Sequence, residues 1–286
     1  MVAQSVRAAS RQDRRVTTSF MPPQTPSLVI DRPALDANLE TMQSLCASAG
    51  VRLRPHGKMH KCSRLGRLQV ERGAVGLCAQ TVGEAEAFVN APDGGIADVL
   101  ITAPSQQWAA PRIAALAARA RIGATADHPD QLAWLGAAAR IAGVTIDLVV
   151  DVDPGTHRAG VHPSHAVALA REAAATRGLR FAGIQMYAGS VQHISETAAR
   201  KRAYDAVIAE AAEVVAALHA AGLPPDVVTG GGTGTHAFDL ASGVFTELQA
   251  GSYALMDVDY RGCEPPDAGG WRFQPALLIA SRVVSA

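Results

Sequence analysis

The stretch Val51-Arg52-Leu53-Arg54-Pro55-His56-Gly57-Lys58-Met59-His60-Lys61 places a lysine just beyond a short extended segment. Apolar and basic residues alternate at positions 51–54, which is typical of a β-strand, and the Pro-His-Gly that follows indicates where the strand ends. Lys58 is therefore predicted to project from a strand end, where it is a candidate nucleophile. Taken alone it is more readily explained as an ordinary surface lysine, so the positions of the other polar residues decide.

Strand-like and helix-like patterns alternate along the rest of the chain. Residues 27–31 predict a strand, and residues 33–49 predict a helix with Pro33 near its first turn. Further extended runs lie at residues 51–55, 74–79, 98–102, 121–125, 144–152, 180–186, 226–228 and 246–250. Most of these runs are separated by a helical pattern, which gives eight strand-helix units.

Such a series predicts a parallel sheet, because parallel neighbours need crossover connections. Eight units fit a closed (β/α)8 barrel of the TIM type, and an open, doubly wound sheet is the alternative. In a barrel the functional residues lie at the carboxyl ends of the strands. The fold prediction therefore places the functional site at the carboxyl ends of the strands.

The composition indicates a globular chain without a polyanionic partner. The chain has 286 residues, of which 48% are hydrophobic, and its formal net charge is zero. This favours neither nucleic acid nor a membrane as partner, and no apolar run approaches a membrane span. The four cysteines show neither metal-ligand spacing nor a disulfide framework, so we expect a cytoplasmic protein. Residues 1–24 are expected to form a disordered tail.

Polar residues follow several of the predicted strands. The candidates at these strand ends are Lys58, Gln80, Arg158, Tyr187, His193, Gly231, Gly232, Thr233, Gly251, Ser252 and Tyr253. The glycines follow the last two strands, where barrels often bind phosphate, and Thr233, Ser252 and Tyr253 add hydroxyl donors. A tight turn is the simpler explanation of a glycine run, and solvent exposure or packing could explain Arg158 and the tyrosines.

A lysine facing a phosphate site across a barrel mouth suits an aldehyde cofactor with a phosphate group. Pyridoxal 5'-phosphate is such a cofactor, because its aldehyde condenses with a lysine amine.

Several segments resemble the D-threonine aldolase and D-serine dehydratase family. They are residues 25–31, 54–61, 80–86, 183–187, 230–235 and 247–257, and the His-Gly-Lys-Met-His-Lys form of the second is most similar to 3-hydroxyaspartate aldolases. The resemblance implies an alanine-racemase-like barrel of the fold-type III enzymes, with Lys58 as the Schiff-base lysine. It also implies that Gln80, Arg158 and Tyr187 surround the cofactor ring, that Thr233, Gly251 and Ser252 hold its phosphate, and that Tyr260 closes the site.

The end of the chain departs from this family. Its members continue into a β domain with a pair of ligands for Mg²⁺ or Mn²⁺, and this sequence shows no such metal pair. We therefore expect a C-terminally truncated protein: a barrel over residues 25–260, then the start of an incomplete β domain over residues 261–286. The apolar strand predicted within residues 271–286 would lack partners and favour association at its edge, for instance in a homodimer.

The expected activity is that of a pyridoxal-phosphate-dependent lyase acting on a small β-hydroxy amino acid. Retro-aldol cleavage would release glycine and an aldehyde, and loss of the metal would impair it. His193 is a candidate acid-base residue. The alternatives are a D-serine dehydratase-like activity, a non-catalytic carrier of pyridoxal phosphate, and an inactive fragment.

Overall fold

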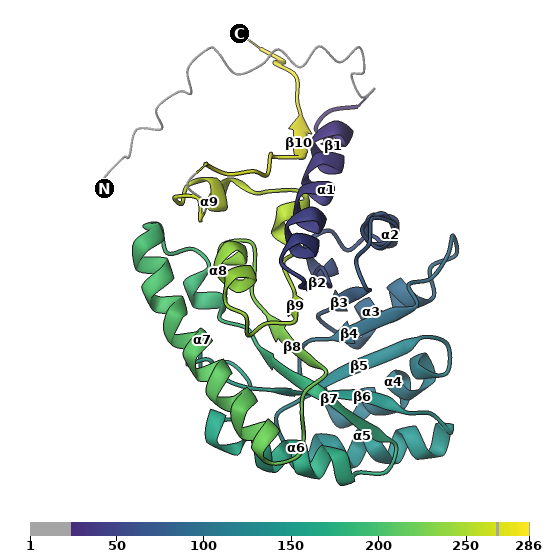
Figure 1. Cartoon of the computed structure of the whole chain (residues 1–286). Helices are drawn as coiled ribbons and strands as arrows, with labels where there is room; N and C mark the ends of the chain where they lie inside the picture. Colours follow the sequence, from purple (N-terminus) through teal and green to yellow (C-terminus); the bar gives the residue numbers. More distant parts are fainter. Residues whose placement is uncertain (1–23, 267–268, 286) are drawn as a thin grey trace, which may run out of the picture.

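The structure is a computed structural model that describes residues 24–266 and 269–285. Within these residues, eight parallel strands form the centre of the molecule (Figure 1). The strands are β2 (Arg52–Leu53), β3 (Leu77–Ala79), β4 (Asp98–Ile101), β5 (Arg121–Ala126), β6 (Ile146–Asp151), β7 (Leu179–Met186), β8 (Val227–Gly230) and β9 (Glu247–Leu248). They pair in the order β2-β9-β8-β7-β6-β5-β4-β3.

The two outer strands of this sheet meet, so the sheet closes on itself. The amide of Cys78 donates to the carbonyl of Pro55 at 2.9 Å, and the amide of Val75 donates to the carbonyl of Leu53 at 2.9 Å. The predicted (β/α)8 barrel is confirmed, and all eight predicted strand positions are occupied by strands. The open-sheet alternative is wrong.

Helices connect the strands and cover the outside of the barrel (Figure 1). They are α1 (Arg32–Ser48), α2 (Ser63–Glu71), α3 (Val82–Val89), α4 (Ala110–Ala117), α5 (Pro129–Ala142), α6 (Ala166–Ala175), α7 (Thr197–Ala220), α8 (His236–Ala241) and α9 (Val258–Arg261). Single 3-10 turns occur at η1 (Gly57–Met59), η2 (Gln107–Ala109), η3 (Pro163–His165), η4 (Gly189–Val191) and η5 (Ser252–Ala254). The largest hydrophobic core lies between the helices and the outer faces of the strands.

The inside of the barrel is built in layers. A small apolar layer consists of Cys78, Leu100, Val149 and Ala182. Two residues further along their strands, polar side chains such as Gln80 and Asp151 follow, because side chains alternate with a period of two. The carboxyl ends of the strands are therefore polar as well as enclosed.

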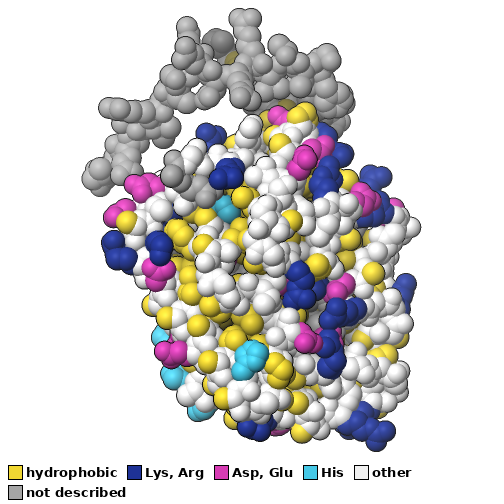
Figure 2. All heavy atoms as spheres, in the orientation of Figure 1, with side chains coloured by type: hydrophobic (Ala, Val, Ile, Leu, Met, Phe, Trp, Pro, Cys, Tyr) yellow, Lys and Arg dark blue, Asp and Glu magenta, His cyan; other side chains and the backbone are white. Residues whose placement is uncertain are grey.

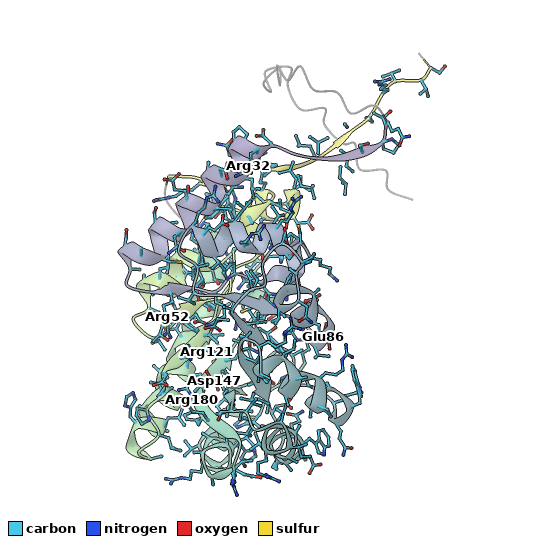
Figure 3. All side chains as sticks on the ribbon, turned by 90° about the vertical axis from the view of Figure 1, so that its right-hand side faces the viewer. Arg32, Arg52, Glu86, Arg121, Asp147 and Arg180 are labelled. Atoms are coloured by element: carbon cyan, nitrogen blue, oxygen red, sulfur yellow. The ribbon has the colours of Figure 1, made fainter. Side chains whose placement is uncertain are left out.

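The amino ends of the strands carry a charged layer. Arg54 lies 2.8 Å from Glu247 and 2.6 Å from Asp98. Arg121, at the next strand along, lies 3.5 Å from Asp98 and 2.8 Å from Asp147. The network continues through Arg180, which bonds to Asp147 and Asp226, and Arg52, which approaches Glu247. Figure 3 shows Arg52, Arg121, Asp147 and Arg180 following one another along these strand ends. Ion pairs thus connect neighbouring strands around the barrel.

The last strand corrects one sequence-based expectation. Strand β10 (Leu277–Ala280), which lies within the predicted apolar strand, is not without a partner. It pairs antiparallel with β1 (Ser27–Ile30), with Ser27 opposite Ala280. The two strands still expose Leu28 and Ile279, 72% and 70% accessible. The predicted tail, apart from Gln24, lies outside the described residues.

The surface is mixed in charge. On the face shown in Figure 2, basic and acidic side chains lie next to one another. No helix among the described residues is long and apolar enough to cross a membrane.

Candidate active site

A cavity opens at the carboxyl ends of the barrel strands. It encloses about 500 Å³ of empty space, including open solvent at its mouth. Its walls are formed by His56, Lys58, Met59, Gln80, Thr102, Arg158, Gln185, Tyr187, Gly232, Thr233, Gln249, Gly251, Ser252 and Tyr260. Most of the residues predicted from strand ends therefore lie around one space.

Lys58 lies in turn η1, directly after the loop that ends β2. His56 caps this turn, and Gly57 lets it approach the barrel wall, since a Cβ there would lie 2.5 Å from the ring of Phe88. The ammonium of Lys58 donates to Gln80 Oε1 at 3.3 Å and lies 5.5 Å from the centre of the Tyr187 ring. Three cavity residues from three strand ends thus converge on one nitrogen.

Gln80 is held in place by the start of helix α3. Its backbone amide donates to Glu84 Oε2 at 2.7 Å, and the amide of Glu84 donates to the hydroxyl of Thr81 at 3.3 Å. This is the usual capping arrangement of a helix N-terminus. Glu84 therefore supports the site from outside the cavity.

Burial and nearby positive charge shift Lys58 and His56 toward their neutral forms. Burial lowers the pKa of Lys58, and the positive charge of Arg158 lowers it further. Burial, followed by the charge of Lys58, lowers the pKa of His56 well below its ordinary value. The guanidinium of Arg158 lies 5.8 Å from the centre of the Tyr187 ring, and among the described residues it forms no ion pair. A neutral amine at Lys58 is the form that can act as a nucleophile.

The hydrogen bonds of His56 define its tautomer. Its Nδ1 accepts from the amide of Lys58 at 3.4 Å, so the ring proton belongs on Nε2. Nε2 then donates to Thr102 Oγ1 at 3.0 Å, and the Thr102 hydroxyl donates to the carbonyl of Ala79 at 3.2 Å. His56 therefore ties the lysine turn to strands β3 and β4.

A buried polar network forms the floor of the cavity. Gln185 donates to Asp151 Oδ1 and to the carbonyl of Thr102, both at 2.9 Å, and Gln249 donates to Gln185 Oε1 at 2.9 Å. Burial raises the pKa of Asp151 to about 7, although the hydrogen bond from Gln185 opposes the shift. Thr102, Gln185 and Gln249 were not predicted as site residues. A signal was present for Thr102, which lies two positions beyond the inward-facing Leu100, but Gln185 lies three positions beyond Ala182 because the register of β7 shifts.

The loops that follow β8 and β9 can bind an oxyanion. The backbone amides of Thr233, Gly251 and Ser252 have no hydrogen-bond partner among the residues that the structure covers. A Cβ on Gly251 would lie 2.9 Å from the carbonyl of His56, so glycine is required for this close approach. Unpaired amides that face one space, together with the hydroxyls of Ser252 and Tyr260, form a suitable site for a phosphate group.

Three predicted residues do not line the cavity. Gly231 is buried behind it, next to the carboxyl group of Asp239. Tyr253 is fully buried, and its hydroxyl accepts from Gln69 at 3.0 Å, because the turn η5 directs it into the core formed with α1. The hydroxyl expected at the phosphate site is therefore not supplied by Tyr253. His193 is exposed, and its ring stacks on Tyr260 at 4.3 Å between ring centres.

The described residues contain no group of three His, Cys, Asp or Glu side chains that could hold a metal ion.

The chain is similar to known proteins over most of its length. The family model for the alanine racemase N-terminal domain matches residues 30–258. The 3-hydroxy-D-aspartate aldolase of Paracoccus denitrificans (strain Pd 1222) is 42% identical over 273 residues, which cover 92% of this chain and 69% of that protein. The D-threo-3-hydroxyaspartate dehydratase of Delftia sp. (strain HT23) is 30% identical over 241 residues, 83% of this chain and 62% of that protein.

A solved structure agrees with these similarities. The crystal structure of D-threonine aldolase from Filomicrobium marinum superimposes with a TM-score of 0.86 at 42% identity. The match covers 90% of this chain and 69% of that chain.

Proposed function

Because this chain belongs to the alanine racemase N-terminal domain family, we propose that it is a pyridoxal-phosphate-dependent lyase of β-hydroxy amino acids. The reaction breaks the Cα–Cβ bond, so that the β-hydroxyl loses its proton, the α-carbon gains one, and glycine and an aldehyde leave. The aldolase from Paracoccus denitrificans is 42% identical to this chain and the dehydratase from Delftia 30%. These identities favour carbon–carbon cleavage over loss of the hydroxyl.

One observation carries the proposal. Lys58, whose pKa is lowered by burial, lines the same cavity as Thr233, Gly251 and Ser252, whose backbone amides have no partner among the described residues. A neutral amine suits the aldehyde of the cofactor, and the amides suit its phosphate.

The residues of the cavity have distinct tasks. Pyridoxal phosphate, when bound, condenses through its aldehyde with an amine and accepts electrons from a bond that breaks at the α-carbon. Lys58 supplies the amine, and Gln80 orients it through the hydrogen bond at 3.3 Å. Tyr187 packs beside this nitrogen and limits the access of water. Arg158 carries the free positive charge that binds the carboxylate of an amino acid.

The candidate for proton transfer is the acid-base residue that the sequence suggested. His193 does not line the cavity, but its ring stacks on Tyr260, which does. We propose that this imidazole, beside the cavity residue Tyr260, accepts the proton of the β-hydroxyl.

The end of the described chain supports a further part of the proposal. Strands β1 and β10 expose apolar side chains, among them Leu28 and Ile279. We propose that residues 261–286 begin a second structural unit and that this apolar surface packs against more protein, as in a homodimer. Light scattering of the purified protein measures the mass directly, and a monomer would contradict the dimer.

The test of cofactor binding is covalent labelling. After addition of pyridoxal phosphate and reduction with borohydride, peptide mass spectrometry should find one label, on Lys58. Lys61 provides the matched control, because it lies three residues away, is 70% exposed and pairs with Glu84. The Lys61→Ala variant should keep the label and the Lys58→Ala variant should lose it. A label on Lys61, or none, would contradict the assignment.

The test of the reaction is product analysis. D-threonine and 3-hydroxy-D-aspartate should each be assayed for the release of glycine, with and without added Mg²⁺ or Mn²⁺. Glycine with an aldehyde supports the lyase proposal. Ammonia with a keto acid would instead indicate a dehydratase, and labelled protein without any product would indicate a carrier of the cofactor.

A further inference from the structure

Four buried side chains lie directly behind the glycine-rich loop at residues 230–234, and none of them lines the cavity. Gln192 follows turn η4, Tyr204 lies in helix α7, Thr235 precedes helix α8, and Asp239 lies within α8. Each is at most 1% exposed. They form one hydrogen-bonded group, which we call the loop bracket.

The Thr235 hydroxyl is the centre of the loop bracket. It accepts from the amide of Gly232 at 3.2 Å and from Gln192 Nε2 at 3.0 Å. Both of those groups are donors only, so the single hydroxyl proton must be directed to the remaining neighbour. That neighbour is Asp239 Oδ2, at 2.8 Å. The donor and the acceptor in each of these three hydrogen bonds are therefore determined.

The other members hold the bracket against the body of the protein. The Tyr204 hydroxyl donates to the second oxygen of Asp239. Gln192 accepts from the amide of Gly234 through Oε1 at 3.0 Å. Gly231 has a φ of +68°, and a Cβ on it would lie 2.4 Å from the Asp239 carboxyl group. The loop can therefore approach Asp239 only because this residue is glycine.

The bracket divides the amides of the loop into two sets. The amides of Gly232 and Gly234 are bonded to Thr235 and Gln192, so they are not available to a ligand. The amide of Thr233, between them, has no partner among the described residues, and Thr233 lines the cavity. Fixing the two flanking peptides fixes the direction of the middle one.

We propose that Thr235 is a positioning residue that selects the Thr233 amide as the phosphate donor of the glycine loop. The inference rests on the proposed function, since it assumes that the cavity binds pyridoxal phosphate. Thr235 itself touches no ligand. It acts through the peptide of Gly232, which also interacts with Asp239, whereas Gln192 holds the peptide of Gly234 directly.

The test compares two ligands and one pair of substitutions. Thr235→Val keeps the shape of the side chain and removes the hydroxyl, whereas Thr235→Ser keeps the hydroxyl. Pyridoxal phosphate and pyridoxal differ only in the phosphate, so the ratio of their dissociation constants reports on the phosphate site. Both constants are measured by absorbance or fluorescence titration of the cofactor-free protein.

Thr229→Val is the matched control. Thr229 is fully buried at the end of β8, and its hydroxyl has no partner among the described residues. Thr229→Val makes the same chemical change at a position outside the loop bracket. Its variant should bind both ligands as the unmodified protein does.

We expect Thr235→Val to weaken the binding of pyridoxal phosphate by roughly tenfold to a hundredfold, the effect of losing one or two well-placed hydrogen bonds. Its affinity for pyridoxal should stay within about twofold of the unmodified protein, and Thr235→Ser should restore most of the phosphate affinity. If Thr235→Val does not fold, Gln192→Met tests the same idea, because it releases the amide of Gly234.

Two outcomes would overturn the inference. One is an equal loss of affinity for both ligands, which would mean that Thr235 only stabilises the fold. The other is a dissociation constant for pyridoxal phosphate equal to that of the Thr229→Val control. If the unmodified protein binds pyridoxal phosphate, either result removes the role of Thr235 and leaves the proposed function in place. If the unmodified protein does not bind pyridoxal phosphate at all, both the role of Thr235 and the proposed function are contradicted.

Discussion

Buried basic side chains have opposite pKa shifts at the two ends of the barrel. At the amino ends of the strands, Arg54 is 6% exposed and bonds to Glu247 and Asp98 at 2.8 and 2.6 Å. Burial alone would lower its pKa, but the two carboxylates outweigh burial and raise it. At the carboxyl ends, Lys58 is also largely enclosed, yet burial and Arg158 together lower its pKa.

The difference lies in the counter-ions. Among the described residues, the amino end places an acidic partner beside each of Arg52, Arg54, Arg121 and Arg180. The carboxyl end gives Lys58 a neutral amide oxygen from Gln80 and a second positive charge nearby. Paired charges connect strands and stay ionised, whereas a buried base without a counter-ion tends to be neutral and reactive. One end is built for stability and the other for chemistry.

The largest expected effect is on stability, at the amino end. Arg54→Met should lower the free energy of unfolding by about 3–5 kcal/mol, because it leaves the buried carboxylate of Glu247 without its partner. Arg52, 3.8 Å from the other oxygen of Glu247, compensates only in part. Urea denaturation measures the loss, and the dissociation constant of pyridoxal phosphate should hardly change.

The double variant Arg54→Met/Glu247→Leu is the control for this prediction. It removes both charges and should recover at least half of the lost stability, because the cost arises from an unpaired ion. A single variant that loses less than about 1 kcal/mol would show that the amino-end network is not needed for stability.

The second prediction concerns the pH dependence of stability. Burial raises the pKa of Asp151 to about 7, so the folded protein binds a proton that the unfolded chain releases at lower pH. Stability from this group is therefore lost as the pH rises from about 4 to about 7. Relative to the unmodified protein, Asp151→Asn should gain on the order of 2 kcal/mol between pH 5 and pH 8. Urea denaturation of the cofactor-free proteins at both pH values tests this.

Asp147, at the amino end, should show the opposite sign. Burial would raise its pKa, but hydrogen bonds from Arg180 and Arg121 outweigh burial and lower it. Its contribution to stability is therefore present above the pKa of the unfolded chain and is lost in acid. If Asp147→Asn and Asp151→Asn changed the pH dependence in the same direction, the contrast between the two ends would be wrong.

A smaller gain in stability is expected from Lys58→Met. Since burial lowers the pKa of Lys58, the charged side chain costs free energy in the folded state at neutral pH. Its replacement should stabilise the cofactor-free protein by about 1 kcal/mol while it abolishes borohydride labelling. The opposite sign would mean that the ammonium has a favourable partner in the fold.

Much of this contrast could be predicted from the sequence, because strand ends are local signals. Alternating apolar residues located the eight barrel strands, and the polar residues just after them include Lys58, Gln80, Arg158 and Tyr187, which do meet in one cavity. The residues predicted from the glycine loops that line the same cavity are Gly232, Thr233, Gly251 and Ser252.

What could not be predicted depends on contacts between distant segments. Gln185 and Gln249 belong to the site only because the barrel closes and turns both inward. Tyr253 and Ser252 are neighbours in one turn, yet the turn directs their side chains to different sides, which residue type does not reveal. The pairing of β1 with β10 joins opposite ends of the chain, and neither strand carries a local sign of its partner.

The smallest expected effect separates the two causes that lower the pKa of Lys58. Burial is the larger cause and Arg158 the smaller one, so Arg158→Leu should raise this pKa only part of the way to its ordinary value. More of the amine is then protonated at neutral pH, and its attachment to an aldehyde should be about threefold slower, as for other interactions of a partly exposed charge. Pyridoxal is the suitable probe, because it lacks the phosphate that Arg158 would attract.

Salt provides the control for this last prediction. Arg158 is exposed, so added salt should screen its charge, raise the pKa of Lys58 and slow attachment in the unmodified protein, but have little effect on Arg158→Leu. Arg171→Leu, an exposed position on helix α6, should behave like the unmodified protein. The difference in rate should also disappear at high pH, where Lys58 is neutral with or without Arg158. Equal rates at every pH and salt concentration would mean that burial alone determines the reactivity of Lys58.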